Sequence, residues 1–252
     1  FRHPDASVKN IECPLFFPVD GRWVLIVAQG KPVDWFVGDL DPVALKFTPT
    51  ARGKADYGQF YAPNVLMNDP DGRKVLWGWL DGVPPKKGWR HCMTLPRVLS
   101  IRPDGTLGQR PLPALSALRG EKKSAEDRLL ADASTALIRL PGESAELSLI
   151  LDRNGDDRAE LKLGESLAIA WDGRTLEVGD SRVPLASEGP LALRIFVDRS
   201  IAEVYAGDVA CASRVIARGP ADGLEVRGAS KGGRASARSI EAWPIGTIWE
   251  AP

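Results

Sequence analysis

Short runs of β-branched and aromatic residues, separated by turn dipeptides, dominate residues 1–118 of this chain. The dipeptides Asp20-Gly21, Asp71-Gly72 and Asp81-Gly82 favour the tight connections of β-hairpins. The runs between such turns include 23–29 (WVLIVAQ), 35–40 (WFVGDL), 61–67 (YAPNVLM) and 74–80 (KVLWGWL). This pattern predicts an all-β architecture that is built from hairpins.

The length of this β-rich region limits which all-β fold it can complete by itself. A four-stranded propeller blade uses about 40 to 50 residues, so residues 1–118 supply roughly two and a half blades. Closed propellers need about four to eight blades. An unclosed set would leave an apolar blade face and an unpaired strand edge in water. We therefore expect a partial propeller whose first blades are missing from this sequence.

The second half of the chain repeats a different β pattern. Its runs, separated by turn signals, include 145–151 (AELSLIL), 159–163 (AELKL), 191–197 (LALRIFV) and 201–206 (IAEVYA). This succession is typical of an antiparallel β-sandwich. Between the halves, leucines at three-residue spacing and a charged stretch predict a partly helical linker. We expect a partial propeller over 1–110, a linker over 111–127 and a sandwich over 128–252.

Charge and composition exclude several classes of function. Lysine plus arginine and aspartate plus glutamate both number 33, so no basic excess points to a nucleic-acid or membrane-surface partner. No apolar run approaches the roughly 18 residues of a spanning helix. The three cysteines and two histidines lack zinc-binding spacing. The chain starts at Phe1 without a signal-type run, which leaves both a cytoplasmic and a secreted destination open.

Several motifs, in a fixed order, carry a resemblance to a known family. They are IECP (11–14), DYGQFYAP (56–63), GRKVLWGWL (72–80), LPRVLS (95–100), DGTLGQRPLPALSALRG (104–120) and LRIFVDRSIAEVYAG (193–207). Together they resemble glycoside hydrolase family 32, the invertases, levanases and inulinases, over residues 11–249. The resemblance implies the last blades of a five-bladed β-propeller followed by a sandwich. It also implies retaining hydrolysis of a fructosyl bond in sucrose or a fructan, without metal or organic cofactor.

Glu12 is the candidate catalytic residue. It matches the acid/base residue of the family, although Leu15 stands where the family usually has an aspartate. Burial beside a second carboxylate would raise its pKa and keep it protonated before attack. The alternative interpretation is a solvated carboxylate at a strand end. In the family the nucleophilic aspartate precedes this motif, and here only eleven residues do so, which predicts that the nucleophile is lacking.

The candidate substrate-binding residues are Asp56, Gln59, Tyr61 and Trp79. The resemblance places Asp56 near the leaving-group sugar, where a carboxylate accepts hydroxyl hydrogen bonds, while an ordinary turn-capping aspartate is the alternative. Gln59 stands where some relatives carry lysine, and Tyr61 borders the same pocket. Trp79 is expected to stack on a sugar ring and Trp77 to pack in the core.

Asp69 offers a second possible nucleophile, because MNDPDG (67–72) resembles the nucleophile motif of the family. Its flanks instead match a late hairpin, so we expect Asp69 to make local turn contacts away from Glu12. The chain is therefore interpreted as the acid/base-bearing portion of a β-fructofuranosidase, inactive alone. Two alternatives stay open: a non-catalytic carbohydrate-binding module, and a two-chain enzyme whose missing blades come from another polypeptide.

Overall fold

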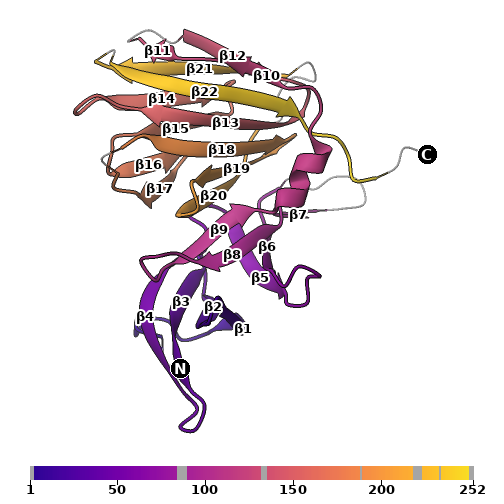
Figure 1. Ribbon diagram of the computed structural model, residues 1–252, viewed down its shortest axis with the longest axis vertical. Coiled ribbons are helices and arrows are strands. Elements are labelled where there is room, and N and C mark those ends of the chain that lie inside the picture. Colours follow the sequence, from indigo (N-terminus) through magenta and orange to yellow (C-terminus); the bar gives the residue numbers. More distant parts are fainter. Residues whose placement is uncertain are drawn as a thin grey trace. The chain divides into compact units, whose positions relative to one another are not determined.

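The computed structural model describes residues 3–83, 90–131, 135–187, 189–217, 223–232 and 234–249 (Figure 1). Strands form nearly all of the regular structure in these ranges, beside the 3₁₀ helix η1 (Pro113–Leu118). The predicted all-β class is confirmed. The chain forms two compact units, Phe1–Leu112 with Asp208–Ser213, and Pro113–Gly207 with Arg214–Pro252.

In the described residues, the first unit contains two antiparallel sheets. The first sheet has the order β1-β2-β3-β4, and its strands are β1 (Glu12–Val19), β2 (Arg22–Ala28), β3 (Asp34–Asp41) and β4 (Lys46–Lys54). The second has the order β5-β6-β8-β9, with β7 also paired to β6. Its strands are β5 (Phe60–Leu66), β6 (Lys74–Leu80), β7 (Cys92–Met93), β8 (Arg97–Ile101) and β9 (Leu107–Pro111). Each antiparallel meander has the form of a propeller blade.

Two of the predicted turn dipeptides, Asp20-Gly21 and Asp71-Gly72, lie in connections between consecutive strands, whereas Asp81-Gly82 follows β6 at the start of a segment whose residues 84–89 lie outside the described ranges. Asp20 and Gly21 have φ angles of 46° and 78° and lie between the paired residues Val19 and Arg22 of β1 and β2. This left-handed pair matches a type I′ hairpin turn, whose twist suits the flanking strands. Gly72, with a φ of 74°, lies in the connection between β5 and β6. The predicted tight hairpin at Asp20-Gly21 is therefore confirmed.

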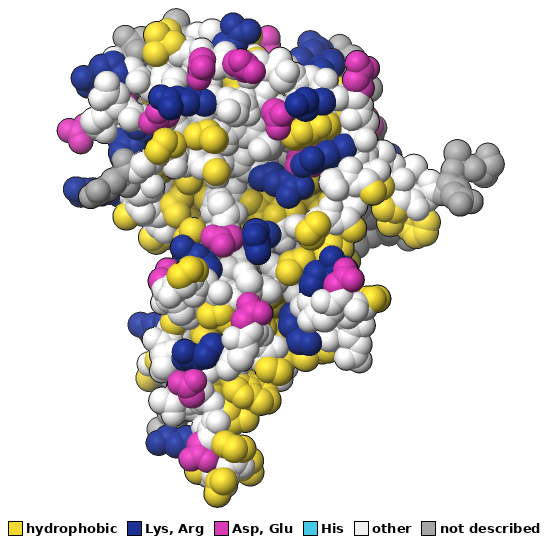
Figure 2. Space-filling model, viewed as in Figure 1, with side chains coloured by type: hydrophobic (Ala, Val, Ile, Leu, Met, Phe, Trp, Pro, Cys, Tyr) yellow, Lys and Arg dark blue, Asp and Glu magenta, His cyan; other side chains and the backbone are white. Residues whose placement is uncertain are grey.

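The two sheets of the first unit share one apolar core. Val24, Ile26 and Trp35 from the first sheet pack in the same cluster as Phe60 and Leu76 from the second. The opposite face of the first sheet carries a smaller cluster, formed by Leu25, Val27 and Phe36 with Ile11 and Phe47. Hydrophobic side chains also reach the surface of this unit (Figure 2), among them Phe16, 42% exposed, whose ring stacks on Trp23. The first sheet is thus apolar on both faces.

The second unit is a β-sandwich. One sheet has the order β10-β22-β13-β18-β19-β20, with β11 also paired to β22, and the other has the order β12-β21-β14-β15-β16-β17. The first comprises β10 (Lys123–Ala125), β11 (Arg128–Leu130), β13 (Ser144–Asp152), β18 (Leu191–Asp198), β19 (Ile201–Ala206), β20 (Ala210–Val215) and β22 (Ala235–Pro244). The second comprises β12 (Thr135–Leu140), β14 (Arg158–Leu163), β15 (Leu167–Trp171), β16 (Thr175–Val178), β17 (Ser181–Pro184) and β21 (Leu224–Lys231). Buried residues alternate along β14 and β21, as in a sheet with one inward face.

Two details of the chain path differ from a simple succession of propeller, linker and sandwich. Within the segment expected to link the domains, β10 pairs with β22 and so belongs to a sheet of the sandwich. The segment Asp208–Ser213 belongs to the first compact unit, although its last four residues also begin β20, a strand of a sandwich sheet. The domain limits drawn from sequence stay a prediction. No helix in the described residues is long and apolar enough to cross a membrane.

Candidate functional site

Glu12 and Tyr61 each lie beside a β-bulge in the first strand of a sheet. In the β1–β2 pair the register shifts between Glu12 and Leu15, and in the β5–β6 pair it shifts between Tyr61 and Asn64. Bulges bend a strand and redirect the side chains beside them. The two bulges therefore set the directions of Glu12 and Tyr61.

The two bulges share one local sequence pattern. Cys13 and Ala62, which directly follow Glu12 and Tyr61, have positive φ angles of 46° and 41°. Pro14 and Pro63 come next, at positions where the interrupted ladder requires no N–H donor. The left-handed region is unfavourable for residues other than glycine, so tertiary contacts must hold both segments in place.

A short hydrogen bond joins the two side chains. The Tyr61 hydroxyl donates to Glu12 Oε2 at 2.6 Å, and the Asn10 amide donates to Glu12 Oε1 at 2.7 Å. The bond to Glu12, followed by burial, raises the pKa of Tyr61 to about 12. Glu12 is exposed at the start of the edge strand β1. Its carboxyl group is therefore oriented by neutral donors and reachable from solvent.

Trp79 lies next to this pair. It is the register partner of Tyr61 on one side and of Met93 on the other. Its half-buried ring forms a T-shaped contact with His91, with 4.7 Å between ring centroids and an interplanar angle of 74°. Glu12, Tyr61 and Trp79 thus form a row across β1, β5 and β6, which we call the Glu12 strip. The strip offers a carboxyl group, a phenol and an aromatic ring to a polar ligand.

Trp77 was expected to pack in the core, but the structure leaves it partly exposed. It is half-buried, and it lines an open hollow of about 500 Å³ whose other lining residues are Asn64, Val65, Leu66 and Met93. Gly78, between the two tryptophans, lies against Phe60, because a Cβ there would meet the Phe60 ring at 2.1 Å. The alternation along β6 therefore buries Gly78, whereas both tryptophans stay partly accessible.

Gln59 lies one residue before β5, where it contacts the end of β6. Its amide Nε2 lies 3.5 Å from the Asp81 carbonyl oxygen, and the Asp81 carboxylate pairs with Lys31. Lys31 follows β2 by three residues, and Ala28 at the end of β2 is the register partner of Glu12. Gln59 and this ion pair therefore lie at the ends of β5, β6 and β2, and the first two of these strands carry part of the Glu12 strip.

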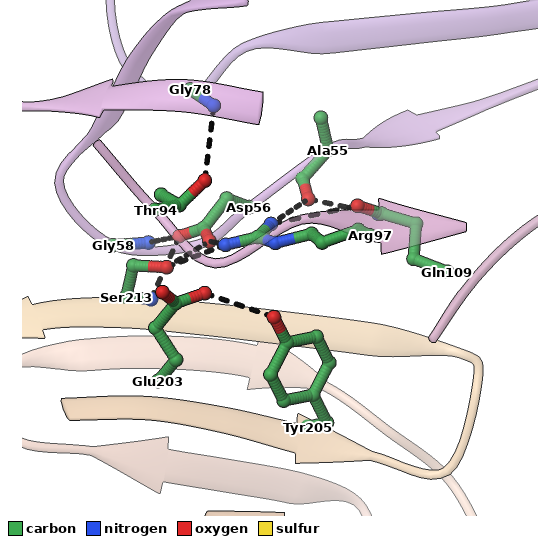
Figure 3. Close-up of polar contacts among 10 residues, drawn as sticks. All are labelled: Ala55, Asp56, Gly58, Gly78, Thr94, Arg97, Gln109, Glu203, Tyr205 and Ser213. Carbon is green, nitrogen blue, oxygen red and sulfur yellow. Dashed lines mark hydrogen bonds and ion pairs between the residues drawn. The ribbon is translucent and has the colours of Figure 1, made fainter. Parts of the chain in front are cut away.

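Asp56 is in a different environment (Figure 3). Its side chain is fully buried, and it accepts four hydrogen bonds: Oδ1 from the amides of Gly58 and Ser213, and Oδ2 from Arg97 Nη2 and the Ser213 hydroxyl. Arg97, also fully buried, lies 4.9 Å from the Phe60 ring centroid. A direct bond from Asp56 to a sugar hydroxyl would need one of these donors to move away.

Sequence reasoning missed the partners of Asp56. Arg97 lies in the LPRVLS motif, but nothing local pairs it with an aspartate 41 positions earlier. Gln109 donates to the Ala55 carbonyl oxygen at 2.8 Å, and its own backbone amide donates to the Asp208 carbonyl. Ser213 lies 157 positions from Asp56. A buried arginine within an apolar strand pattern was the signal that could have predicted a buried carboxylate partner.

Asp69 makes the local contacts that its flanks predict. Its carboxylate accepts hydrogen bonds from Arg73 Nε at 2.7 Å and from the backbone amide of Asp71 at 3.0 Å. Hydrogen bonding to Arg73 lowers the pKa of Asp69, and the Gly72 amide closes the turn on the Asp69 carbonyl. The prediction of local turn contacts is confirmed. Among the residues that the structure describes, no group of three or more His, Cys, Asp or Glu side chains is arranged to hold a metal ion.

Family models match both parts of the chain. Residues 1–111 match the model described as glycosyl hydrolases family 32 N-terminal domain, and residues 114–244 match the one described as glycosyl hydrolases family 32 C terminal. The chain is 31% identical over 225 residues to a sucrose-6-phosphate hydrolase of Salmonella typhimurium, covering 77% of this chain and 45% of the relative. It is 28% identical over 214 residues to a levanase of Bacillus sp. (strain L7), covering 75% and 22%.

Solved structures share the fold. Fructan 1-exohydrolase IIa from Cichorium intybus superposes with a TM-score of 0.78 at 16% identity, covering 96% of this chain and 62% of that one. This likeness confirms the predicted fold, a partial propeller followed by a β-sandwich. The chain spans about half the length of the sucrose-6-phosphate hydrolases that it matches.

Proposed function

This chain belongs to family 32 of the glycosyl hydrolases, and on that premise we propose that it is the acid/base-bearing part of a retaining β-fructofuranosidase. Glu12 donates a proton to the leaving-group oxygen of a fructosyl bond and later activates the water that releases fructose. The observation that carries this proposal is the hydrogen bond from Tyr61 to an exposed Glu12.

The position of Glu12 leaves its carboxyl group within reach of a substrate. A catalytic acid must lie within hydrogen-bond reach of the substrate oxygen, and an exposed carboxyl group at a bulge meets that need. Tyr61 and Asn10 each donate to one oxygen of the carboxylate, so they restrict its rotation. Orientation of this kind reduces the entropy that is lost when acid and substrate align.

The retaining mechanism needs a second carboxylate about 5 to 5.5 Å from the first. We assign that role neither to Asp69, which is bound to Arg73, nor to Asp56, which is buried with four donors. We propose that the nucleophile comes from propeller blades outside this sequence. Two blade-like sheets cannot close a ring, and the apolar second face of the first sheet suits a neighbouring blade.

The substrate we propose is a sucrose- or fructan-type carbohydrate. Trp79 would stack on the apolar side of a sugar ring, while Gln59 and Tyr61 would hydrogen-bond its hydroxyls. Asp56, the fourth residue predicted to bind sugar, would contribute by holding the backbone before Gln59 in place. Support for this substrate class comes from the names of relatives, which include sucrose-6-phosphate hydrolases and levanases. The proposed chemistry needs no metal or organic cofactor.

The decisive experiment supplies the remaining blades. The chain would be joined to the N-terminal part of the Salmonella typhimurium sucrose-6-phosphate hydrolase, the part that it does not match. Release of fructose from sucrose, sucrose 6-phosphate and levan would then be measured. We expect the joined protein to release fructose from these substrates, and we expect the chain alone to release none at an enzymatic rate. Sugar binding by a folded joined protein without turnover would favour the carbohydrate-binding module instead.

Glu12→Gln in the joined protein tests the role of Glu12. The substitution removes the proton donor and keeps nearly the same shape, so turnover of sucrose should fall by about 10² to 10⁴-fold while binding persists. An aryl fructoside with an activated leaving group needs little protonation and should lose less. Asp69→Asn is the matched control, because it also converts a carboxylate to an amide and should leave turnover unchanged. Equal losses of turnover on both substrates would mean that Glu12 is not the proton donor but a solvated carboxylate at a strand end.

A further inference from the structure

The segment Asp208–Ser213 forms hydrogen bonds with residues 56–59, the start of the motif DYGQFYAP (56–63) that contains Tyr61. The amide of Tyr57 donates to the Cys211 carbonyl at 2.9 Å, and the amide of Gln59 donates to the Ser213 carbonyl at 2.8 Å. Alternate residues of the motif therefore bond to alternate residues of the segment, as neighbouring strands do. The strand β5 begins at the next residue, Phe60.

Side chains reinforce this ladder from the buried side (Figure 3). Ser213 donates its amide and its hydroxyl to the two oxygens of Asp56, at 3.0 and 2.7 Å. Arg97 Nη2 bonds both the Ser213 hydroxyl, at 2.7 Å, and Asp56 Oδ2, at 2.9 Å. Because all three side chains are buried, each relies on the others for hydrogen bonds that water cannot replace.

Gly58 allows the two segments to approach this closely. A Cβ at Gly58 would lie 2.0 Å from the Ser213 carbonyl oxygen and 2.8 Å from the Ser213 amide nitrogen, both backbone atoms. Any larger residue must therefore push the segment away from the motif. The close fit fixes residues 56–59 immediately before the strand that carries Tyr61.

We propose that Asp208–Ser213, through Ser213 and its partners Asp56 and Arg97, is a positioning element that sets where Tyr61 meets Glu12. These residues touch no substrate. They hold the start of β5, and the bulge after Tyr61 directs its hydroxyl to Glu12. The consequence for catalysis rests on the proposed function, in which Glu12 is the acid/base, whereas the effect on the Tyr61–Glu12 bond does not.

The test reads the Tyr61–Glu12 bond directly in this chain, without substrate. The chain has three tyrosines, so 3-fluorotyrosine labelling gives three ¹⁹F resonances that Tyr→Phe variants assign. Fluorination lowers phenol pKa values, which keeps the titration in a mild pH range. The Tyr61 resonance should titrate well above free fluorotyrosine, and Glu12→Gln should lower its pKa because the carboxylate acceptor is gone.

Ser213→Ala should lower the Tyr61 pKa by about one unit or more, because the loosened motif no longer holds the phenol against Glu12. Ser230→Ala is the matched control: Ser230 is also a buried serine, lies 3.4 Å from the Asp157 carboxylate and belongs to the sandwich. It should leave the Tyr61 titration unchanged. Gly58→Ala should have a larger effect than Ser213→Ala, provided that tryptophan fluorescence shows a folded chain.

The proposal is overturned if folded Ser213→Ala keeps the wild-type Tyr61 titration, or if Ser230→Ala shifts it equally. If Gly58→Ala does not fold, Ser213→Ala decides the question. A Glu12→Gln enzyme that kept its activity would defeat the proposed function. It would leave the ¹⁹F result standing, because that result involves no turnover.

Discussion

Two carboxylates of the first unit, Glu12 and Asp56, have opposite surroundings. Glu12 is exposed, and Tyr61 and Asn10, which donate hydrogen bonds to it, are neutral. Asp56 is fully buried and paired with an equally buried Arg97. A buried charge persists only with a partner, whereas a proton donor must stay within reach of a ligand. The difference teaches that a carboxylate in a family-like motif can serve either the fold or the chemistry, and that burial separates the two.

The largest expected effect comes from breaking the buried pair. Asp56→Ala removes the buried carboxylate that accepts hydrogen bonds from Arg97 and Ser213, and should lower the free energy of unfolding by about 3 to 5 kcal/mol. Glu12→Ala, at an exposed site, should change it by about 0.5 kcal/mol or less. Urea unfolding followed by tryptophan fluorescence measures both. Similar losses for the two variants would remove the distinction between the carboxylates.

A second change acts on the ring beside Arg97. A Cβ at Gly78 would meet the Phe60 ring at 2.1 Å, so Gly78→Ala should push Phe60 toward the buried pair and cost about 1 to 3 kcal/mol. Gly189→Ala is the matched control, because nothing lies within 4 Å of a Cβ at that position. Urea midpoints of the two variants give the comparison. No loss in Gly78→Ala would mean that Phe60 repacks freely.

The hydrogen bond between Tyr61 and the exposed Glu12 should affect the stability of the chain at alkaline pH. The pKa of Tyr61 is raised from 10.0 to about 12 in the folded state, chiefly by the bond to Glu12. A raised pKa stabilises fully below the unfolded value and loses that effect as pH rises through the folded value. The stability advantage of wild type over Tyr61→Phe should therefore be constant below pH 10 and shrink between about pH 10 and 12. Urea unfolding across that range measures it, and a constant difference would argue against the bond.

The smallest expected effect concerns Asp69, whose carboxylate is bound in a turn. Hydrogen bonding to Arg73 lowers its pKa below the usual 3.8, so its contribution is present above that value and lost as pH falls through the folded pKa. Asp69→Asn should therefore differ from wild type near neutral pH and converge with it in acid. Thermal unfolding at several pH values checks this. Divergence toward acid would show that the carboxylate is not held by Arg73.

Much of the fold could be predicted because its signals are local. The dipeptide Asp20-Gly21 predicts a hairpin from turn chemistry alone, and alternation along Leu191–Asp198 predicts a strand of the sandwich. The Glu12–Tyr61 bond spans 49 positions, and the Asp56–Ser213 bond spans 157. No propensity or spacing carries information over such separations. The expected core position of Trp77 failed for a related reason, since alternation identifies a shared face but not what covers it.

By itself the sequence determined the all-β class, the hairpins, the family resemblance and the choice of Glu12 as the candidate acid/base. Only the tertiary structure decided that Glu12 stays open on an edge strand with Tyr61 as its donor, and that Asp56 is closed off by Arg97 and Ser213. The physical reason is that burial is a property of what packs against a residue. For Asp56 that packing comes from a segment that follows most of the chain, and its hydrogen bonds exist only once the chain has folded.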